Sequence, residues 1–234
     1  MKFDQKLILG KIKKRYKRFL ADITLENGEA VTAHIANTGS MKTCWEPGWK
    51  VAVSYHDDPK RKLKYSLELT HNGKTWIGVN TSLPNKLAYQ SILEGKIPEL
   101  YGYSEIKPEA TIGKSRIDLL LEANNLPDCY VEIKNVTMLA NSNEAIFPDA
   151  VSERGLKHLH ELAGIKRNGM RAVMLYIIQR EDVEVFRPAF EIDEEYARAL
   201  KEVESLGVEI LAYRCQVSPE GVEIEKRLPL TFNF

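Results

Sequence analysis

Two carboxylates and one lysine form the strongest candidate for a chemical site in this sequence. Asp118 ends the segment Ser-Arg-Ile-Asp, and Glu132 and Lys134 alternate in the segment Val-Glu-Ile-Lys. Successive side chains of a strand point to opposite faces, so Glu132 and Lys134 would share one face. A neighbouring strand that carries Asp118 would bring a second carboxylate to that face. Unpaired charge beside buried strands is costly, which favours a functional reason for it.

The chemistry that this trio supports is metal-assisted phosphodiester hydrolysis. Carboxylate oxygens of Asp118 and Glu132, with the backbone carbonyl of Ile133, are ligands that Mg²⁺ or Mn²⁺ accepts. Lys134 would position the attacking water and offset charge on the phosphorane. The alternative is chance, because the chain has 33 acidic and 33 basic residues, and an acid-x-Lys triplet is common on a solvated strand face.

Four further residues are weaker candidates for the same site. Glu109 and Glu94 could be supporting ligands, although a surface charge is the favoured interpretation of each. Arg154 and His158 lie on the polar stripe of a predicted helix, from which they could reach the scissile phosphate.

The elements that must position these residues begin near residue 83. Apolar residues at helical spacing predict a helix that opens at Leu83 and stops at Gly95. We then expect these segments in chain order: strand Glu105–Ile112 with a turn at Gly113–Lys114, two strands containing Asp118 and Val131–Lys134 around a turn at Ala123–Asp128, loop Met138–Phe147, a helix from Pro148, strand Arg171–Gln179, helix Asp193–Leu206 and strand Val208–Gln216. The order is αβββαβ, then αβ.

The first part of the chain has an all-β pattern. The candidate strands, separated by turn signals such as Asn72-Gly73, are Arg15–Leu25, Glu29–Thr38, Lys50–Asp57, Lys64–His71 and Lys74–Asn80. Five short strands in this length favour a small closed barrel of the oligonucleotide-binding (OB) type. We therefore predict a mixed α/β protein with an OB-like domain at 1–82 and a second domain at 83–234.

Charge is unevenly divided between these two parts. Residues 1–82 have 15 basic and 8 acidic residues, whereas the whole chain is balanced, so residues 83–234 are acidic. Basic side chains interleaved with aromatic ones suit a single-stranded or flexible nucleic acid as the partner. The candidate contacts are Arg15, Lys17, Arg18, Lys60, Arg61 and Lys62. The alternative is that these residues only solvate the surface and that the aromatic side chains are core.

Composition suggests a cytoplasmic protein. Cys44, Cys129 and Cys215 are odd in number and far apart, which indicates neither a disulfide framework nor a zinc cluster. We see no signal region and no apolar run near the length of a membrane span.

The αβββαβ order with its Asp and Glu-x-Lys positions resembles the core of the PD-(D/E)xK nuclease superfamily. Nearly the full chain also resembles the sugar fermentation stimulation protein family. The stretches that carry this resemblance are 15–22, 37–41, 78–81, 115–118, 131–136 and 147–155. It implies an OB-like domain, a nuclease-like domain, DNA binding and a regulatory role in sugar metabolism, notably of maltose.

Two positions depart from the expected patterns. Ile117 stands where the superfamily name has Pro, a change that leaves the ligand Asp118 intact. His34 is followed by Ile35-Ala36, where the family suggests Cys-Pro.

Three functions remain open at this point. The chain could be a DNA-binding protein with a working nuclease site, or a DNA-binding regulator that no longer cleaves. It could also be a sugar or nucleotide enzyme with the barrel as an interaction module. The complete trio favours the first, and no glycine-rich nucleotide loop or nucleophile elbow supports the third.

Overall fold

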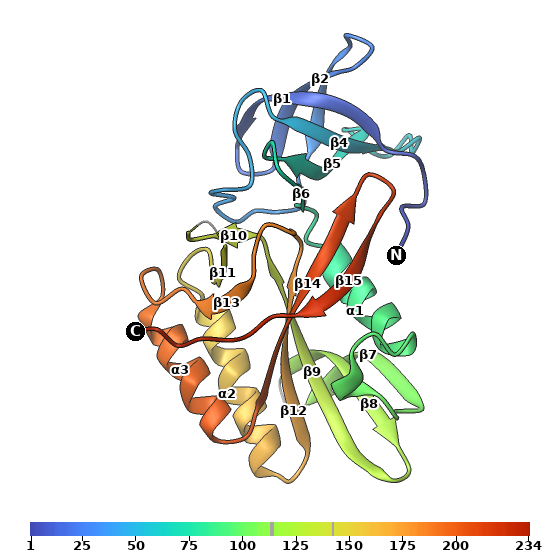
Figure 1. The fold of residues 1–234 in the computed structure, drawn as a ribbon. Coiled ribbons are helices and arrows are strands. Elements are labelled where there is room, and N and C mark those ends of the chain that lie inside the picture. The colour runs from blue at the N-terminus through green and yellow to red at the C-terminus, as the bar shows by residue number, and fades with distance from the viewer. Residues whose placement is uncertain (113–114, 142) are drawn as a thin grey trace.

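A closed β-barrel forms the first part of the computed structural model, which describes residues 1–112, 115–141 and 143–234 (Figure 1). Its strands are β1 (Ile8–Tyr16), β2 (Leu20–Leu25), β3 (Ala30–His34), β4 (Lys50–Tyr55), β5 (Tyr65–His71) and β6 (Trp76–Gly78). They pair in the order β3-β2-β1-β4-β5-β6, and a parallel β3–β5 pair closes the ring. The predicted five-stranded OB-like barrel is confirmed, with β6 added to its β5 edge.

The predicted first strand, Arg15–Leu25, is wrong because the chain turns within it. Strand β1 starts earlier, at Ile8, and ends at Tyr16, and β2 starts at Leu20. Lys17 and Arg18 make the turn with φ angles of 50° and 66°. Non-glycine residues seldom adopt positive φ, and hairpin turns of this kind usually contain glycine or asparagine. This turn contains neither, so no local signal marks the hairpin in the sequence.

A six-stranded sheet with helices on both faces forms the second part (Figure 1). In chain order its elements are helix α1 (Leu83–Leu93), a short 3₁₀ turn (Pro98–Leu100), β7 (Glu105–Ile112), β8 (Ser115–Ala123), β9 (Leu126–Val136), α2 (Glu153–Arg167), β12 (Arg171–Ile178), α3 (Glu194–Ser205), β14 (Glu209–Ser218) and β15 (Gly221–Arg227). The strand order is β15-β14-β12-β9-β8-β7, and β9, β12 and β14 run parallel. The predicted αβββαβ order, followed by αβ, is confirmed.

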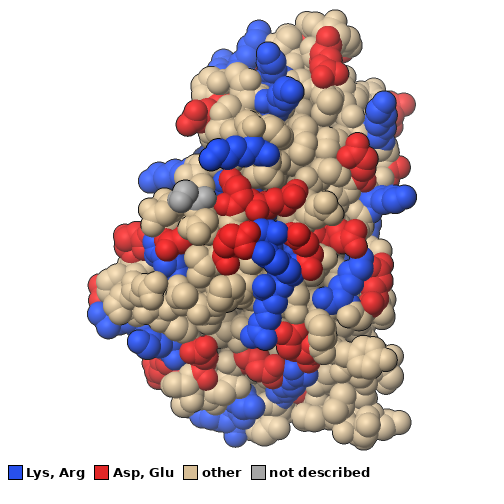
Figure 2. Space-filling model, in the orientation of Figure 1, with Lys and Arg blue, Asp and Glu red and all other residues tan. Residues whose placement is uncertain are grey.

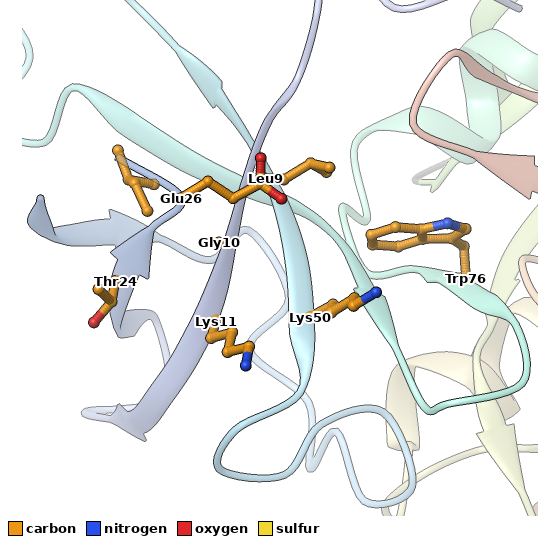
Figure 3. Close-up of a pocket in the computed structure, with 8 residues that line it drawn as sticks. Leu9, Gly10, Lys11, Thr24, Glu26, Lys50 and Trp76 are labelled. Atoms are coloured by element: carbon orange, nitrogen blue, oxygen red, sulfur yellow. The ribbon is translucent and has the colours of Figure 1, made fainter. Parts of the chain in front are cut away.

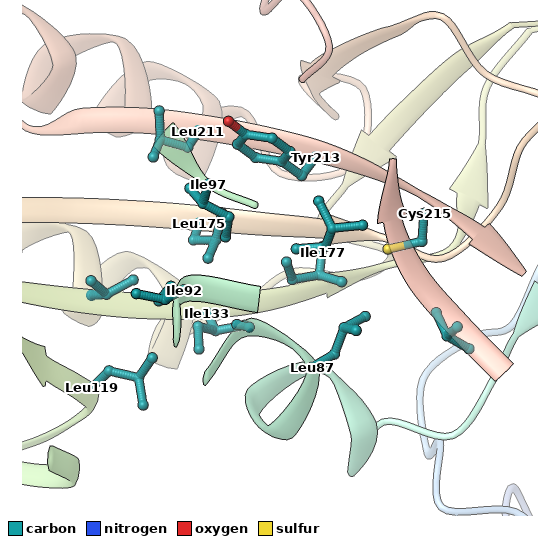
Figure 4. Close-up of a cluster of buried hydrophobic side chains, with 14 of the residues drawn as sticks. Leu87, Ile92, Ile97, Leu119, Ile133, Leu175, Ile177, Leu211, Tyr213 and Cys215 are labelled. Atoms are coloured by element: carbon teal, nitrogen blue, oxygen red, sulfur yellow. The ribbon is translucent and has the colours of Figure 1, made fainter. Parts of the chain in front are cut away.

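Alternation along the central strands creates one hydrophobic core on each face of this sheet. On one face Leu175 and Ile177 pack with Leu87 and Ile92 of α1, as Figure 4 shows. The intervening β12 residues, such as Tyr176, pack with α2 and α3 on the other face. A strand that is covered on both faces has a continuous run of apolar residues. This run is why β12 could be predicted from the sequence.

Several predicted boundaries in the second part need correction. Leu126–Asp128 belong to β9, so the turn is shorter than predicted, and the predicted loop contains β10 (Met138–Leu139) and β11 (Glu144–Phe147). These two strands form a small sheet with β13 (Val185–Pro188). Neither β13 nor β15 was predicted from the sequence. Helix α2 begins at Glu153 rather than Pro148, because the Ser152 side chain caps it by accepting from Gly155 N. The predicted turn at Gly113–Lys114 lies outside the described residues.

Buried polar contacts join the barrel to the second sheet. Gly78 N donates to Gln179 O at 2.9 Å, and Ile77 bridges to Arg180. Met1 N donates to Val222 O, so the first residues of the chain lie along β15. The division of the chain into domains at residues 82 and 83 stays a prediction.

Cys44, Cys129 and Cys215 are buried and free. Within the described residues, no helix has the length and apolar character that crossing a membrane requires.

Candidate functional site

Asp118 lies where strands β8 and β9 separate. Their antiparallel ladder runs through Leu121–Cys129 and Leu119–Val131. One step further the same register would set Asp118 opposite Glu132, but the ladder stops before this pair. The Asp118 side chain takes the place of the missing backbone partner, because its Oδ2 accepts from Ile133 N at 2.8 Å. The carboxylate is thereby held against the strand that carries Glu132 and Lys134.

Asp118 is held in a partly buried position from two sides. In addition to Ile133 N, the Asn85 side chain of α1 donates to Asp118 Oδ1 at 2.8 Å. Burial raises the pKa of Asp118 above its usual value, and the nearby charge of Glu132 raises it further. The hydrogen bonds from Ile133 and Asn85 offset this rise only in part. The negative charge of Asp118 therefore destabilises the folded protein.

Glu132 is the most buried charge of the site, with 2% of its surface exposed. Its Oε1 receives Lys134 Nζ at 2.6 Å and also contacts His158 Nδ1 of α2. Burial favours a raised pKa, but the His158 hydrogen bond and the Lys134 charge outweigh it, so the pKa of Glu132 lies below its ordinary value. Its second oxygen, Oε2, is buried and has no hydrogen-bond partner within the described residues.

Arg154 and Lys134 both contact His158. Arg154 Nε lies 3.4 Å from His158 Nε2, and Lys134 Nζ lies 3.1 Å from His158 Nδ1, the nitrogen that also contacts Glu132. Both candidates that the sequence placed on the polar stripe of α2 therefore lie at the site. His158 contacts Glu132 directly, and Arg154 contacts His158.

The described side chains suit a hard divalent cation with few protein ligands. They contain no group of three or more His, Cys, Asp and Glu side chains gathered to hold a metal. Asp118 and Glu132 would supply two carboxylates, and the unpartnered Glu132 Oε2 is a free buried ligand atom. Mg²⁺ is often held by one or two carboxylates, with water and substrate phosphate completing its shell. This donor set fits that pattern.

Glu109 and Glu94 do not join these residues. Glu109 has a φ of 58°, and its carboxylate pairs with Arg116 at 3.4 Å, with both side chains about two thirds exposed. Glu94 follows the last turn of α1, far along the helix from Asn85, and pairs with Lys96 at 2.9 Å. Asn85 is the contact that the sequence analysis missed. Its only signal was its place in the first turn of a helix that precedes the Asp118 strand.

The candidate basic contacts of the barrel have different surroundings. The Arg15 guanidinium donates to the carbonyls of Gly39 at 2.8 Å and Arg18 at 2.6 Å, and Arg18 Nε donates to Thr38 O. These two arginines therefore hold the loop that follows β3. Arg61 donates to Ser66, whereas the three lysines among these candidates, at positions 17, 60 and 62, are exposed. Nucleic-acid binding by these residues stays a prediction.

Comparison with known proteins matches both parts of this architecture. A family model described as the N-terminal OB domain of SfsA matches residues 14–79, and one described as the sugar fermentation stimulation protein RE domain matches residues 82–221. The chain is 53% identical over 217 residues to a sugar fermentation stimulation protein homolog of Geotalea uraniireducens, covering 92% of this chain and 93% of the homolog. The chain belongs to the sugar fermentation stimulation protein family.

Other members of the sugar fermentation stimulation family agree in length and fold. A homolog of Maricaulis maris is 51% identical over 227 residues, with 97% of each chain covered. The solved structure of Pyrococcus furiosus SfsA in complex with Ca²⁺ has a TM-score of 0.88 and 28% identity, and the match covers 99% of this chain and 98% of that one.

In this family member a polar cleft of about 210 Å³ lies between the barrel and the second part. One of its lining residues, Asn135, directly follows Lys134 in the chain. From the barrel, the loop at Asn37–Gly39 completes the lining, and Ser40 N donates to Asp149 Oδ2 at 2.8 Å. The cleft is therefore lined by both parts of the chain.

Replacing the two carboxylates should change the stability of the metal-free protein in opposite directions. Asp118 has a raised pKa, so its charge destabilises the folded state once the pH exceeds its unfolded pKa. Glu132 has a lowered pKa, so its charge stabilises the folded state at neutral pH, and this contribution disappears as the pH falls. At pH 7 in EDTA we expect Asp118→Asn to raise Tm and Glu132→Gln to lower it.

Thermal unfolding followed by circular dichroism measures both shifts. Repeating the scans at progressively lower pH is the control, and both differences should shrink as the carboxyls become protonated. A fall in Tm for Asp118→Asn at pH 7 would show that its hydrogen bonds outweigh the cost of its charge.

Proposed function

We propose that this protein binds DNA and is a phosphodiesterase that depends on a divalent cation, Mg²⁺ or Mn²⁺. Asp118 and Glu132 would hold the cation, which would polarise the scissile phosphate and lower the pKa of a bound water. Lys134 would hold the attacking water and offset the charge that develops in the transition state. His158 and Arg154 would keep Glu132 oriented.

The observation that carries this proposal is the electrostatic state of the two carboxylates. The partly buried carboxylate of Asp118 lies close enough to the buried Glu132 for Glu132 to raise its pKa, while Glu132 Oε2 lacks a partner among the described residues. A cation between them would remove both costs at once. The Ca²⁺ complex of Pyrococcus furiosus SfsA supports a site for a hard divalent cation in this family.

The polar cleft supports a strand of nucleic acid as the substrate. Its walls offer hydroxyl and amide groups from Thr38, Thr81 and Asn135, together with the carboxylate of Asp149. Both parts of the chain line it, so one strand in the cleft could touch the barrel and, at Asn135, the strand that carries Glu132 and Lys134. The family resemblance adds a regulatory role in sugar metabolism, notably of maltose, to the proposal.

Cleavage of labelled DNA tests the proposal. We expect the full chain to cut single- or double-stranded DNA in the presence of Mg²⁺ or Mn²⁺. Addition of EDTA should abolish this cleavage. Asp118→Ala should abolish cleavage and leave DNA binding in place, since it removes a metal ligand rather than a contact to DNA.

Two outcomes would contradict the assignment. Cleavage that survives in Asp118→Ala would belong to another site or to a contaminant. A wild-type protein that binds DNA and cuts no substrate with either metal would be a non-cleaving regulator on the same fold.

A further inference from the structure

A second pocket lies on the outer surface of the barrel and shares no lining residue with the cleft. Its volume is about 270 Å³, and most of its wall is apolar. The lining residues come from β1, β2, β4, β6 and the residue after β2: Leu9, Gly10, Lys11, Thr24, Leu25, Glu26, Lys50 and Trp76. In Figure 3, Leu9 and Glu26 lie at one end, and Lys11 and Lys50 lie at the other.

The floor of this pocket depends on a glycine. At Gly10 strand β1 passes so close to β2 that a Cβ atom would lie 2.7 Å from Thr24 O and 2.9 Å from a methyl carbon of Ile23. Any other residue would force these strands apart. Gly10 therefore lets β1 and β2 pack closely beneath the pocket, whose wall includes Leu9, Leu25 and Trp76.

Two lysines lie side by side at one end of this pocket, and neither pairs with a carboxylate among the described residues. Lys11 of β1 is the direct cross-strand partner of Lys50 of β4. Like charges in directly opposite positions destabilise a sheet. Neither ammonium forms an ion pair with a carboxylate within the described residues, although Glu26 lines the same pocket. This arrangement is one that a bound anion would stabilise.

The lysines belong to a row that ends in aromatic rings. The register pairs Lys50 with His71 on β5, and His71 with Trp76 on β6. The His71 and Trp76 rings meet edge to face with centroids 4.9 Å apart. Trp76 is only partly buried, so one part of the indole remains available at the pocket. Cations and an aromatic surface thus stand on one face of neighbouring strands.

We propose that this pocket binds one nucleotide of a single-stranded nucleic acid, a contact that rests on the proposed DNA binding. Its base would stack against Trp76 and fill the apolar hollow, and its flanking phosphates would lie on Lys11 and Lys50. Base stacking on an aromatic ring and phosphate contacts from lysine are the two elements of sequence-tolerant single-strand binding.

Several other basic residues are already engaged with carboxylates or backbone carbonyls. Over the second part of the chain, acidic and basic side chains interleave on the face shown in Figure 2. There Arg214 pairs with Glu225 at 2.8 Å, and Lys226 with Glu184 at 2.6 Å. Arg15 and Arg18 are engaged with backbone carbonyls. Lys11 and Lys50 combine exposure, lack of a counter-ion and an adjacent aromatic ring.

Binding of a fluorescein-labelled oligo(dT) to the full chain in EDTA tests the proposal, with anisotropy as the readout. Trp76→Leu, which keeps apolar packing, should weaken binding by at least about fivefold, the lower end of the stacking effect. The double variant Lys11→Gln/Lys50→Gln should weaken binding and reduce the slope of log K against log salt by about 1.4. An abasic oligonucleotide of equal length should bind without any dependence on Trp76.

The matched control is Lys166→Gln/Lys201→Gln, which makes the same charge change on helices α2 and α3. It should bind like wild type, and melting curves establish that all variants fold. Wild-type affinity in the Lys11 and Lys50 variant, or no binding by the wild type at low salt, would overturn the pocket assignment. Binding that depends on the pocket in a protein without nuclease activity would overturn only the proposed cleavage.

Discussion

Lys134→Met is expected to lower kcat by about 100- to 1000-fold while the affinity for Mn²⁺ stays the same or increases. A charged donor aimed at the transition state is worth about this factor in other hydrolytic sites. Because the lysine acts on the transition state rather than on the bound substrate, KM should hardly change. Methionine keeps most of the length of a side chain that is only 14% exposed.

The measurement pairs single-turnover cleavage with calorimetric titration of Mn²⁺. Lys157→Met is the matched control, since Lys157 lies on α2 with its side chain 63% exposed and forms a surface pair with Glu161 at 3.5 Å. It should cleave at the wild-type rate. Loss of Mn²⁺ binding in Lys134→Met would assign the lysine to the structure of the metal site instead of to the chemical step.

Arg180→Met should destabilise the protein by about 3–5 kcal/mol, the usual cost of breaking a buried ion pair from one side. Arg180 is fully buried, and its guanidinium bonds to both carboxylate oxygens of Asp182 at 2.6 and 2.8 Å. A third bond reaches Thr137 O at 2.7 Å. Although burial acts in the opposite direction, Arg180 holds the pKa of Asp182 below its usual range.

This arginine also joins the two parts of the chain. Asp182 accepts from the Asn72 side chain of the barrel at 2.9 Å, and Arg180 NH1 lies 3.4 Å from Thr43 O. Loss of the guanidinium would therefore loosen the barrel as well as leave Asp182 poorly compensated. Urea unfolding measures the change, and Arg116→Met is the control, because its exposed pair with Glu109 should contribute less than about 1 kcal/mol. Equal effects of the two variants would refute the structural role of Arg180.

Local sequence patterns predicted much of the fold and the centre of the site. The apolar run of β12 and the alternation around Glu132 and Lys134 are properties of consecutive residues, so they can be read without knowing the fold. The spacing of helical residues likewise placed His158 and Arg154 on one stripe, where His158 contacts Glu132 and Arg154 contacts His158.

Features that depend on long-range contacts could not be predicted in this way. The Lys17–Arg18 turn has positive φ without glycine, and its arginine is bonded to the distant Thr38. Asn85 contacts Asp118 only because α1 packs beside β8 and β9. The row from Lys11 to Trp76 exists only in the register of the assembled barrel, since its members are scattered along the chain.

The most direct test of the account is an anomalous difference map from crystals soaked in Mn²⁺. The account predicts one peak between the carboxylates of Asp118 and Glu132, about 2.1 Å from their nearest oxygens, as for a small octahedral cation. The peak should disappear in crystals of Asp118→Ala. A protein that cleaves DNA with Mn²⁺ but shows its peak elsewhere, or shows none at these carboxylates, would contradict the assignment of the catalytic site.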